Sequence, residues 1–551
     1  MGNGNTGFGG FDTGDYVQRA AGTADLVTAP LRYVNVQDYA GAPSATVDAY
    51  TQIAAAAAEA STLGIPLYFP GTYRTSKPLT PAADAIWVGP SQYTPALTVE
   101  PTDYPNFSYD YIVNCTNSDV TLIDFAVDGQ KRNGTNPANE CGGIQVGPNT
   151  MLIRCRVDDP NMFGYWIGST ATQVRMIDCR SARGGNNDAI GGGGGNDVKI
   201  IRHVWEATTA GNRFDNVNGT GVELIECVDL STNSGGIYFE GMVASGAKSC
   251  SLFGATGITI QSDGSYSPAT VTNPLRCFAV DNDIPAGNNG IELSYYGGAT
   301  AQNKGGYNQI TGNRIDGVTG NGVGMIGPNP CSNACYGGDQ ITGNQIRNPN
   351  ASGGTTWNPG TGTSPYSGVN ILQGYKVKVR GNTIIDDRAT HLMNYAISLG
   401  GGSGGGTNGV EVAGNTCAGS TYQGGGSPGE INLNNATSVA SYIHDNDLPT
   451  GIQGTADTTT VIRNNVGYNP VGSVTVAVPA SGTAVSAAVY DRTFYVSTVS
   501  GTTACSMAVQ NGPTVTFVGS VAQVVPVRVP AGQTLTPTYT GTAPTWVVEG
   551  E

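Results

Sequence analysis

One short sequence pattern returns every 24 residues in the second quarter of the chain. Residues 151–157, 174–180, 198–204 and 222–228 each carry an apolar, strand-like stretch that ends on a marker residue. The four markers are Cys155, Cys179, His203 and Cys227. A fixed period of this size is typical of a solenoid, in which each repeat buries its apolar stripe only against its neighbours.

Asparagine occupies the same marker slot farther along the chain. The residues concerned are Asn282, Asn313, Asn344, Asn382, Asn415 and Asn446. Within each repeat the apolar residues alternate, as Val174 and Met176 do, and this is the spacing of a strand and not of a helix. Short strands, glycine bends and a polar residue stacked at one bend predict an all-β fold, the right-handed parallel β-helix.

The bulk composition agrees with an ordered β-solenoid. The 551 residues include 81 glycines, which recur at bends and serve backbone conformations closed to other residues. Charged residues make up 12% and hydrophobic residues 39%, a balance that excludes disorder. The net charge of −15 argues against nucleic acid as a partner, because nucleic acid needs a basic face.

Cysteine usage predicts neither disulfides nor a metal. Cys155, Cys179 and Cys227 share equivalent slots and are expected to stack as buried thiols. Cys331 and Cys335 share one loop without a second pair or a histidine to complete a zinc site, and no cofactor is expected. The first residues lack a signal-peptide pattern and no apolar run reaches membrane-spanning length, so we expect folding in a reducing compartment and no membrane contact.

The chain divides into four expected parts. Residues 1–30 form an N-terminal arm, residues 31–118 a capping segment with the first strands, residues 119–469 the β-helix, and residues 470–551 a small C-terminal β domain. An alanine-rich helix is predicted from Val47 onward, with an apolar face of Tyr50, Ile53 and Ala57 that covers the first rung. Residues 80–118 are predicted to be irregular loops.

The capping segment also carries a family resemblance. The run Phe69-Pro70-Gly71-Thr72-Tyr73 follows a strand and the alanine-rich helix. This order resembles the opening of the pectate-lyase-superfamily β-helices, especially bacteriophage tailspikes and related polysaccharide depolymerases. The resemblance implies a bacterial surface polysaccharide as partner, a homotrimer, and attachment to a phage tail or baseplate through the N-terminus. The protein would then be made in the host cytoplasm and act outside the cell as part of the virion tail.

Insertions are predicted to lengthen some rungs and to build a binding face. Residues 283–308, 327–338 and 347–366 are the stretches concerned, and they carry Tyr295, Tyr296, Tyr307, Trp357 and Tyr366. Long loops on one side of a solenoid commonly form its binding face. The C-terminal strands are expected to act as a cap and as a trimerisation or sugar-binding module.

Two outward columns of side chains are predicted on one wall of the solenoid. If the isoleucines and phenylalanine of these strands point inward, the first column contains Gly191, Asp215, Tyr238, Thr259 and Glu292. The second column contains Glu240, Gln261 and Ser294. Consecutive rungs would therefore present acids, an amide and a tyrosine on one face.

Paired carboxyls of this kind suit the hydrolysis of glycosidic bonds. One must be protonated and the other ionised, at ~5–5.5 Å for retention or ~6.5–9.5 Å for inversion. We expect Asp215 and Glu240 to be the acid and base, with Glu292 next and Asp188 behind. The predicted substrate-binding residues are Arg213, Tyr238, Gln261, Tyr295 and Tyr296. For any one acid, a merely solubilising surface role is the competing interpretation.

Two other features have simpler structural interpretations. His203 occupies the marker slot, so a buried histidine hydrogen-bonded to backbone is expected in place of a catalytic one. The run Gly191–Gly195 lacks the following lysine and hydroxyl residue of a phosphate loop.

Three functions remain open from the sequence. The first is an endo-acting glycosidase that depolymerises a capsule, exopolysaccharide or O-antigen. The second is a polysaccharide lyase, for which Arg213, Tyr238 and Lys304 are the candidate residues. The third is a non-catalytic receptor-binding adhesin, because the same fold can serve all three.

Overall fold

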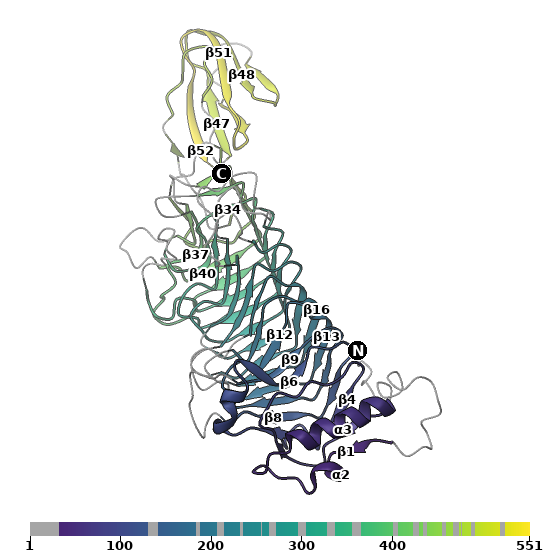
Figure 1. Cartoon of the computed structure of the whole chain (residues 1–551). Coiled ribbons are helices and arrows are strands. Elements are labelled where there is room, and N and C mark those ends of the chain that lie inside the picture. Colours follow the sequence, from purple (N-terminus) through teal and green to yellow (C-terminus); the bar gives the residue numbers. More distant parts are fainter. Residues whose placement is uncertain are drawn as a thin grey trace, which may run out of the picture.

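The chain forms a long parallel β-helix with a cap at its N-terminal end and two small antiparallel sheets at its C-terminal end (Figure 1). This computed structural model describes residues 32–130, 141–182, 188–206, 214–231, 235–254, 256–263, 272–295, 305–327, 337–354, 365–400, 406–421, 429–433, 438–454, 459–466, 473–474, 476–485, 491–517 and 524–550. Three parallel sheets, named A, B and C here, contain 16, 13 and 13 strands. The predicted right-handed parallel β-helix is confirmed.

Sheet A contains β1 Val34–Asn35, β2 Leu67–Tyr68, β4 Ile86–Val88, β7 Thr121–Ile123, β10 Met151–Ile153, β13 Thr172–Ile177, β16 Asn196–Ile201, β19 Thr220–Ile225, β22 Gly246–Lys248, β25 Phe278–Val280, β28 Gln309–Thr311, β31 Gln340–Thr342, β35 Lys378–Arg380, β39 Glu411–Ala413, β43 Tyr442–His444 and β45 Val461–Arg463. Sheet B contains β3 Tyr73–Arg74, β5 Leu97–Thr98, β8 Ala126–Asp128, β11 Arg156–Asp158, β14 Arg180–Ala182, β17 Val204–Glu206, β20 Val228–Asp229, β23 Ser251–Leu252, β26 Asp283–Ile284, β29 Arg314–Asp316, β32 Gln345–Arg347, β36 Thr383–Ile385 and β40 Thr416–Ala418.

Sheet C contains β6 Asp110–Cys115, β9 Cys141–Val146, β12 Tyr165–Ile167, β15 Ile190–Gly192, β18 Phe214–Val217, β21 Ile237–Glu240, β24 Ile258–Gln261, β27 Ile291–Ser294, β30 Val323–Ile326, β33 Ser367–Ile371, β37 Tyr395–Leu399, β41 Ile431–Leu433 and β44 Ile452–Gly454. A short parallel sheet beside them contains β34 Gly374–Tyr375, β38 Thr407–Asn408 and β42 Ser438–Val439. Through most of the solenoid a rung follows the order A, B, C, with one strand from each sheet.

The bend between sheets A and B explains why the marker slot repeats. The residue before each marker adopts a left-handed conformation, with φ of 50° at Arg154, 52° at Arg202, 54° at Asp281 and 69° at Gly312. The chain turns there within two residues, and the marker side chain then points into the core. Each rung repeats this bend, which is why the sequence period is visible.

The asparagine markers form a continuous hydrogen-bonded ladder. The Asn282 amide nitrogen and side-chain Nδ2 donate to Asn313 Oδ1 at 3.0 and 2.9 Å, and Asn313 repeats both bonds to Asn344 Oδ1. The same pairing continues to Asn465, so each amide satisfies backbone and side-chain groups of the next rung. The predicted structural role of this series is confirmed.

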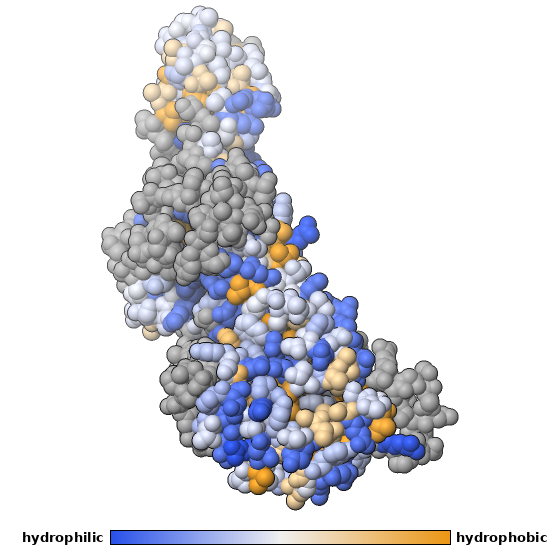
Figure 2. All heavy atoms as spheres, viewed as in Figure 1, coloured by the Kyte–Doolittle hydropathy of each residue, from blue (hydrophilic) through white to orange (hydrophobic). Residues whose placement is uncertain are grey.

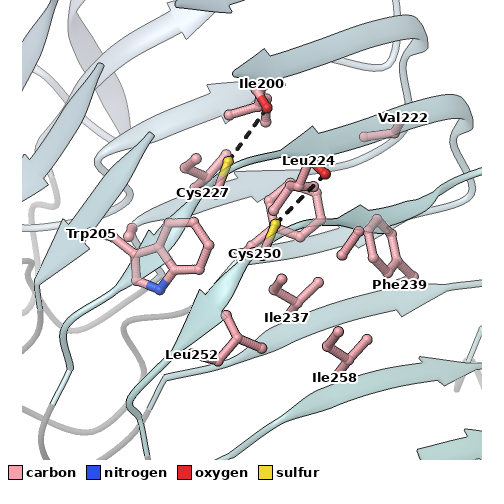
Figure 3. Close-up of a cluster of buried hydrophobic side chains, with 14 of the residues drawn as sticks. Ile200, Trp205, Val222, Leu224, Cys227, Ile237, Phe239, Cys250, Leu252 and Ile258 are labelled. Atoms are coloured by element: carbon pink, nitrogen blue, oxygen red, sulfur yellow. Dashed lines mark hydrogen bonds between the residues drawn. The ribbon is translucent and has the colours of Figure 1, made fainter. Parts of the chain in front are cut away.

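Thiols fill the same slot in the earlier rungs. Cys155, Cys179, Cys227 and Cys250 are buried and unpaired by disulfides, as predicted for the first three. Burial raises the pKa of Cys179 and Cys227 well above the usual range. Figure 3 shows two of these thiols directed at carbonyl oxygens of the preceding rung, with the Cys227 Sγ 3.4 Å from the Ile200 oxygen.

His203 is the one imidazole in this column of the described residues, and it is fully buried. Its Nε2 lies 2.9 Å from the Ser181 hydroxyl, and its ring packs against Tyr165 and Trp205. Burial lowers the pKa of His203 to about 3, so the ring is neutral. The structural interpretation of this residue is confirmed, although its partner is a side-chain hydroxyl and not backbone.

The β-helix begins earlier in the chain than the sequence indicated. Helix α2 spans Gln37–Ala40, helix α3 spans Tyr50–Leu63, and a 3-10 helix spans Pro101–Asn106. Ile53, Ala56 and Ala60 of α3 are buried against the core. The expectation of irregular loops over residues 80–118 was wrong, because β4, β5 and β6 in that stretch already pair into the three sheets. Those strands are two to six residues long, too short for a visible period.

The C-terminal strands form two antiparallel sheets. One contains β46 Ser473–Val474, β52 Thr545–Gly550, β47 Arg492–Ser497 and β50 Val524–Val529, and the other β49 Thr514–Phe517, β48 Thr502–Val509 and β51 Leu535–Gly541. They enclose a hydrophobic core of their own that includes Phe494, Met507 and Leu535. The predicted change from parallel rungs to short alternating strands is confirmed.

Candidate active site

The outer face of sheet C carries the first predicted column. Asp215 of β18 pairs in register with Gly191 of β15 and with Tyr238 of β21. Tyr238 pairs with Thr259, and Thr259 with Glu292 of β27. Their neighbours along each strand, such as Phe214, are fully buried, so the column faces outward as the sequence predicted.

The second column lies two residues farther along the same strands. Glu240 pairs in register with Gln261, and Gln261 with Ser294. Gln261 Nε2 donates a hydrogen bond to Glu240 Oε1. Ser294 Oγ donates to Glu292 Oε1 at 2.9 Å, so this column also supports the outermost acid of the first one.

Strand spacing determines how far apart the acids lie. Neighbouring strands are about 4.8 Å apart and successive residues rise about 3.3 Å. Asp215 and Glu240 are on adjacent strands with a stagger of two residues, so their backbone positions are roughly 8 Å apart. Glu292 is three strands from Asp215, roughly 14 Å along the axis. Asp215 and Glu240 are therefore neighbours, whereas Glu292 belongs to the far end of the same wall.

Glu292 is the acid on this wall whose environment favours protonation. Its burial raises the pKa above the usual range, while hydrogen bonds from Ser294 and from Asn289 Nδ2, at 3.0 Å to Oε2, act in the opposite direction. A raised pKa is what a carboxyl needs in order to act as an acid, but Glu292 lies three strands from Asp215.

The strands of sheet C are acidic and contain no cation. Asp110, Asp215, Glu240 and Glu292 lie within the thirteen strands, and none of their residues is lysine or arginine. Long connections follow β24, β27 and β30 and lead from sheet C into sheet A. The stretch 283–294 is not one of them, because it contains the regular strands β26 and β27.

The remaining predicted site residues lie in the first column, outside both columns, or outside the described residues. Asp188 lies ahead of β15, where its carbonyl accepts a hydrogen bond from the Gly164 amide, and it is outside both columns. Arg213 and Tyr296 lie outside the described residues, as does Lys304. Tyr238 is half-buried beside Asp215 in the first column.

The assignment of Tyr295 to substrate binding was wrong. Its side chain is 1% exposed and its hydroxyl donates to Asp339 Oδ2 at 2.8 Å inside the core. The chain turns inward after β27, and Asn308 Nδ2 donates a second hydrogen bond to the same hydroxyl at 2.6 Å. A ring enclosed in this way cannot stack on a sugar.

Sequence reasoning missed an aromatic pair on this wall. Trp166 of β12 pairs in register with Gly191 and Gln145, so it belongs to the column of Asp215. Its ring centroid lies 4.7 Å from that of Phe163. The alternation in Tyr165-Trp166-Ile167, with Tyr165 and Ile167 buried, was the signal that could have revealed it.

The described residues offer neither a metal site nor a membrane-spanning helix. No group of three or more histidine, cysteine, aspartate or glutamate side chains there could hold a metal ion. In the same residues, no helix combines the length and apolar character needed to cross a membrane.

Comparison with known proteins gives structural neighbours only. No family model matches the sequence, and no curated protein matches it. Among solved structures, the chain is similar to a tailspike variant of the E. coli bacteriophage HK620, at 10% identity, TM-score 0.48, over 94% of this chain and 93% of that one. That tailspike was solved in complex with a pentasaccharide.

Two other neighbours carry different names. One is a GH87 α-1,3-glucanase from Streptomyces thermodiastaticus, at 15% identity, TM-score 0.48, over 70% of this chain and 69% of that one. The other is the A-module of the mannuronan C-5 epimerase AlgE6 from Azotobacter vinelandii, at 16% identity, TM-score 0.42, over 79% of this chain and 98% of that one. At these identities, the chemistry must be argued from the residues of this chain.

Proposed function

We propose that this protein is a depolymerase that hydrolyses glycosidic bonds of a bacterial surface polysaccharide. The observation that carries the proposal is the placement of Asp215 and Glu240 on adjacent strands, two residues apart in register, on the outer face of a sheet whose strands contain no lysine or arginine. Two carboxyls in different environments on either side of a glycosidic bond are what hydrolysis requires.

In this proposal Asp215 and Glu240 divide the acid and base roles. Their backbone spacing of roughly 8 Å is compatible with the ~6.5–9.5 Å between carboxyls that leaves room for a water molecule in an inverting hydrolase. Gln261 holds Glu240 by donating to one of its oxygens, which orients the carboxyl across the wall. Glu292, held by Ser294 and Asn289, would contact a sugar residue farther along the chain of the polymer.

The residues of sheet C favour hydrolysis over β-elimination. A lyase must neutralise a uronate carboxylate, which needs a cation or a metal beside the substrate. The strands of sheet C offer acids, amides and hydroxyls but no lysine or arginine. The acids on these strands disfavour a uronate and suit a polymer whose reacting residues are neutral.

The test is incubation with a panel of capsular and O-antigen polysaccharides, followed by product mass analysis. The proposal expects shortened products that carry new reducing ends and no ultraviolet-absorbing unsaturation. Unsaturated ends would establish a lyase instead, and binding without shortening would establish an adhesin.

We also propose that the protein is a homotrimer carried on a phage virion tail, attached through its N-terminal arm. A stripe on sheet A supports a subunit contact: Val88, Ile123, Ile153, Ile177, Ile201 and Ile225 stack in register on neighbouring strands, and all but the buried Ile153 are half-buried. Apolar stripes of this length on a sheet surface are typical of interfaces. Light scattering on the purified protein should give three times the chain mass of 56.5 kDa, and a monomer mass would reject the trimer.

A further inference from the structure

The aromatic pair Phe163 and Trp166, on the outer side of sheet C, packs over glycines. Trp166 is followed in its column by Gly191, and Gly193 comes two residues farther along that chain segment. A Cβ atom at position 191 would lie 2.4 Å from the Phe163 ring and 3.1 Å from the Trp166 ring. A Cβ at position 193 would lie 3.5 Å from the far edge of the same indole. The two rings therefore occupy the space that side chains at these positions would fill.

We propose that Phe163 and Trp166 form a stacking platform that binds an uncharged sugar residue, two strands before Asp215. The inference rests on the proposed function, because it extends the same wall into a second subsite. From Trp166 to Asp215 the column advances two strands, or roughly 10 Å, which a short run of linked sugar residues can span.

The chemistry of the platform fits a pyranose ring. Both aromatic side chains are half-buried, in contrast to the fully buried Tyr165 and Ile167 on either side of Trp166. An indole offers an apolar face for the C–H groups of a sugar and an N–H for one of its hydroxyls. The next residue in the column, Gln145, is half-buried and adds an amide that can bind hydroxyl groups.

Charge around the platform selects against an anionic sugar. The neighbouring strands β9, β15 and β18 contribute Gln145, Gly191 and Asp215 to the column and no lysine or arginine. A uronate or sialate placed there would lie near the Asp215 carboxylate, and none of these strands contains a lysine or arginine. The platform is therefore expected to prefer neutral hexoses or their N-acetylated forms.

The competing occupant is a second copy of the chain, because exposed aromatic rings also pack at subunit interfaces. The platform shares its column with Asp215 and Tyr238, whereas the apolar stripe on sheet A lies on another wall. Polar side chains and glycines surround the platform, and such surroundings are more typical of a sugar-binding site than of a packed subunit interface.

Binding of oligosaccharides to the full chain tests the platform. The probes are neutral fragments released from O-antigen polysaccharides by mild acid, with fragments of a uronate-rich capsule as the anionic arm. For a neutral fragment that binds, W166A should weaken the affinity by about tenfold or more, whereas W166F should stay near the parent protein. Y93A, which removes an exposed ring from another part of the molecule, serves as the matched control and should bind normally.

The tryptophan emission provides an independent readout. Binding of a neutral fragment should shift the fluorescence of the parent protein more than that of W166F, because W166F lacks the ring that the fragment contacts, while Trp87 and Trp205 are buried in the core. Unchanged affinity in W166A, or a preference for the anionic fragments, would overturn the platform. A fall in molecular mass of W166A without loss of binding would overturn it in favour of a subunit contact.

These outcomes separate the platform from the proposed hydrolysis. If fragments bind through Trp166 but no polymer is shortened, the platform stands and the hydrolase proposal fails. If W166A shortens a polymer with the kcat/KM of the parent protein, the hydrolase proposal stands and the platform fails.

Discussion

Two buried asparagines of the β-helix have opposite surroundings. Asn313 donates from Nδ2 to Ala279 and to Asn344, and its Oδ1 accepts two bonds from Asn282. Asn216, on the inner side of β18 next to Asp215, is also fully buried, but neither its Nδ2 nor its Oδ1 has a partner among the described residues. A buried polar group without a partner costs about 1–3 kcal/mol.

Replacing each of these asparagines with leucine should change stability in opposite directions. N216L should raise the free energy of unfolding by about 1–2 kcal/mol, because it removes two unsatisfied groups without changing the side-chain size much. N313L should lower it by roughly 3 kcal/mol or more, since it breaks the ladder and leaves its neighbours unpaired. Urea unfolding measures both, and destabilisation by N216L would show that the Asn216 amide is hydrogen-bonded in solution.

A buried carboxyl makes stability depend on pH. Asp339 accepts hydrogen bonds from Tyr295 and from the amide and side chain of Asn308, and it is 1% exposed. Burial raises the pKa of Asp339 from 3.8 to about 6. The folded state thus holds this proton more tightly than the unfolded chain. The contribution of Asp339 to stability is therefore fully present below about pH 3.8 and is lost as the pH rises to about 6.

D339N should remove this part of the pH dependence. Since one pKa unit corresponds to about 1.4 kcal/mol, the ionisation of Asp339 costs at most roughly 3 kcal/mol between those limits. The difference in unfolding free energy between D339N and the parent protein should therefore grow from pH 4 to pH 6 and then stay constant. A difference that does not change with pH would contradict the raised pKa.

At the residue scale, the sequence predicted the face of a strand on which a side chain lies better than it predicted the residues that the side chain contacts. The outward columns of Asp215 and Glu240 followed from alternation alone, because a strand places every second residue on one face. Tyr295 was misplaced because it follows the last paired residue of β27, where alternation no longer applies. Whether a residue beyond a strand turns inward depends on partners in other rungs, such as Asp339, which are distant in sequence.

At the scale of the element, glycines serve two distinct purposes in the rungs. At the bend between sheets A and B, glycine adopts a left-handed backbone conformation without strain. Gly381 is an example, with φ of +61° and no atom within 4 Å of where a Cβ would lie. At the start of the sheet C strands, glycines allow close approach, because a Cβ on Gly257 would lie 1.8 Å from the Gly290 carbonyl oxygen. Only the second purpose forbids every side chain.

Substitutions at these two positions should differ sharply. G257A should destabilise the protein by about 3 kcal/mol or prevent folding, since the rungs would have to separate. G381N should change stability by no more than about 1 kcal/mol, because Asp281 and Asn464 already occupy the equivalent conformation. Thermal unfolding of the two variants is the measurement, and a G257A protein as stable as G381N would contradict the close packing.

The rungs were predictable where each strand and bend repeated its residue types. The marker slot reveals them from Cys155 to Asn446, since the same two-residue bend needs the same kind of side chain each time. The first rungs were not predictable, because their short strands β4 and β5 are joined by connections of unequal length. Cys250 also belongs to the marker column, although its neighbouring residues do not repeat the motif.

At the scale of the whole molecule, the ends of the solenoid need protection. Sheet A begins at β1, and α3 packs its buried residues over that end of the core (Figure 1). The face of the β-helix shown in Figure 2 is mostly hydrophilic near the N-terminal end, with hydrophobic residues in small separate groups. An unprotected end would expose strand edges that pair with other chains.

Loosening the cap should therefore produce aggregation. I53D places a charge at a fully buried position of α3, whereas Q52D places the same charge at the exposed neighbouring position. I53D should aggregate in a concentration-dependent way on mild heating, and Q52D should remain dispersed. Light scattering during a thermal ramp distinguishes them, and equal behaviour would mean that α3 is not the element that protects this end.

In the proposed function, sheet C cuts polysaccharide through Asp215 and Glu240. Once a polymer that the protein shortens is identified, new reducing ends should be counted for D215N, E240Q and D283N. D283N is the control, because Asp283 is a partly exposed acid on sheet B. We expect a loss of at least about a hundredfold in rate for D215N and for E240Q, with D283N close to the parent protein. Parent-like rates in both D215N and E240Q would contradict the proposed function.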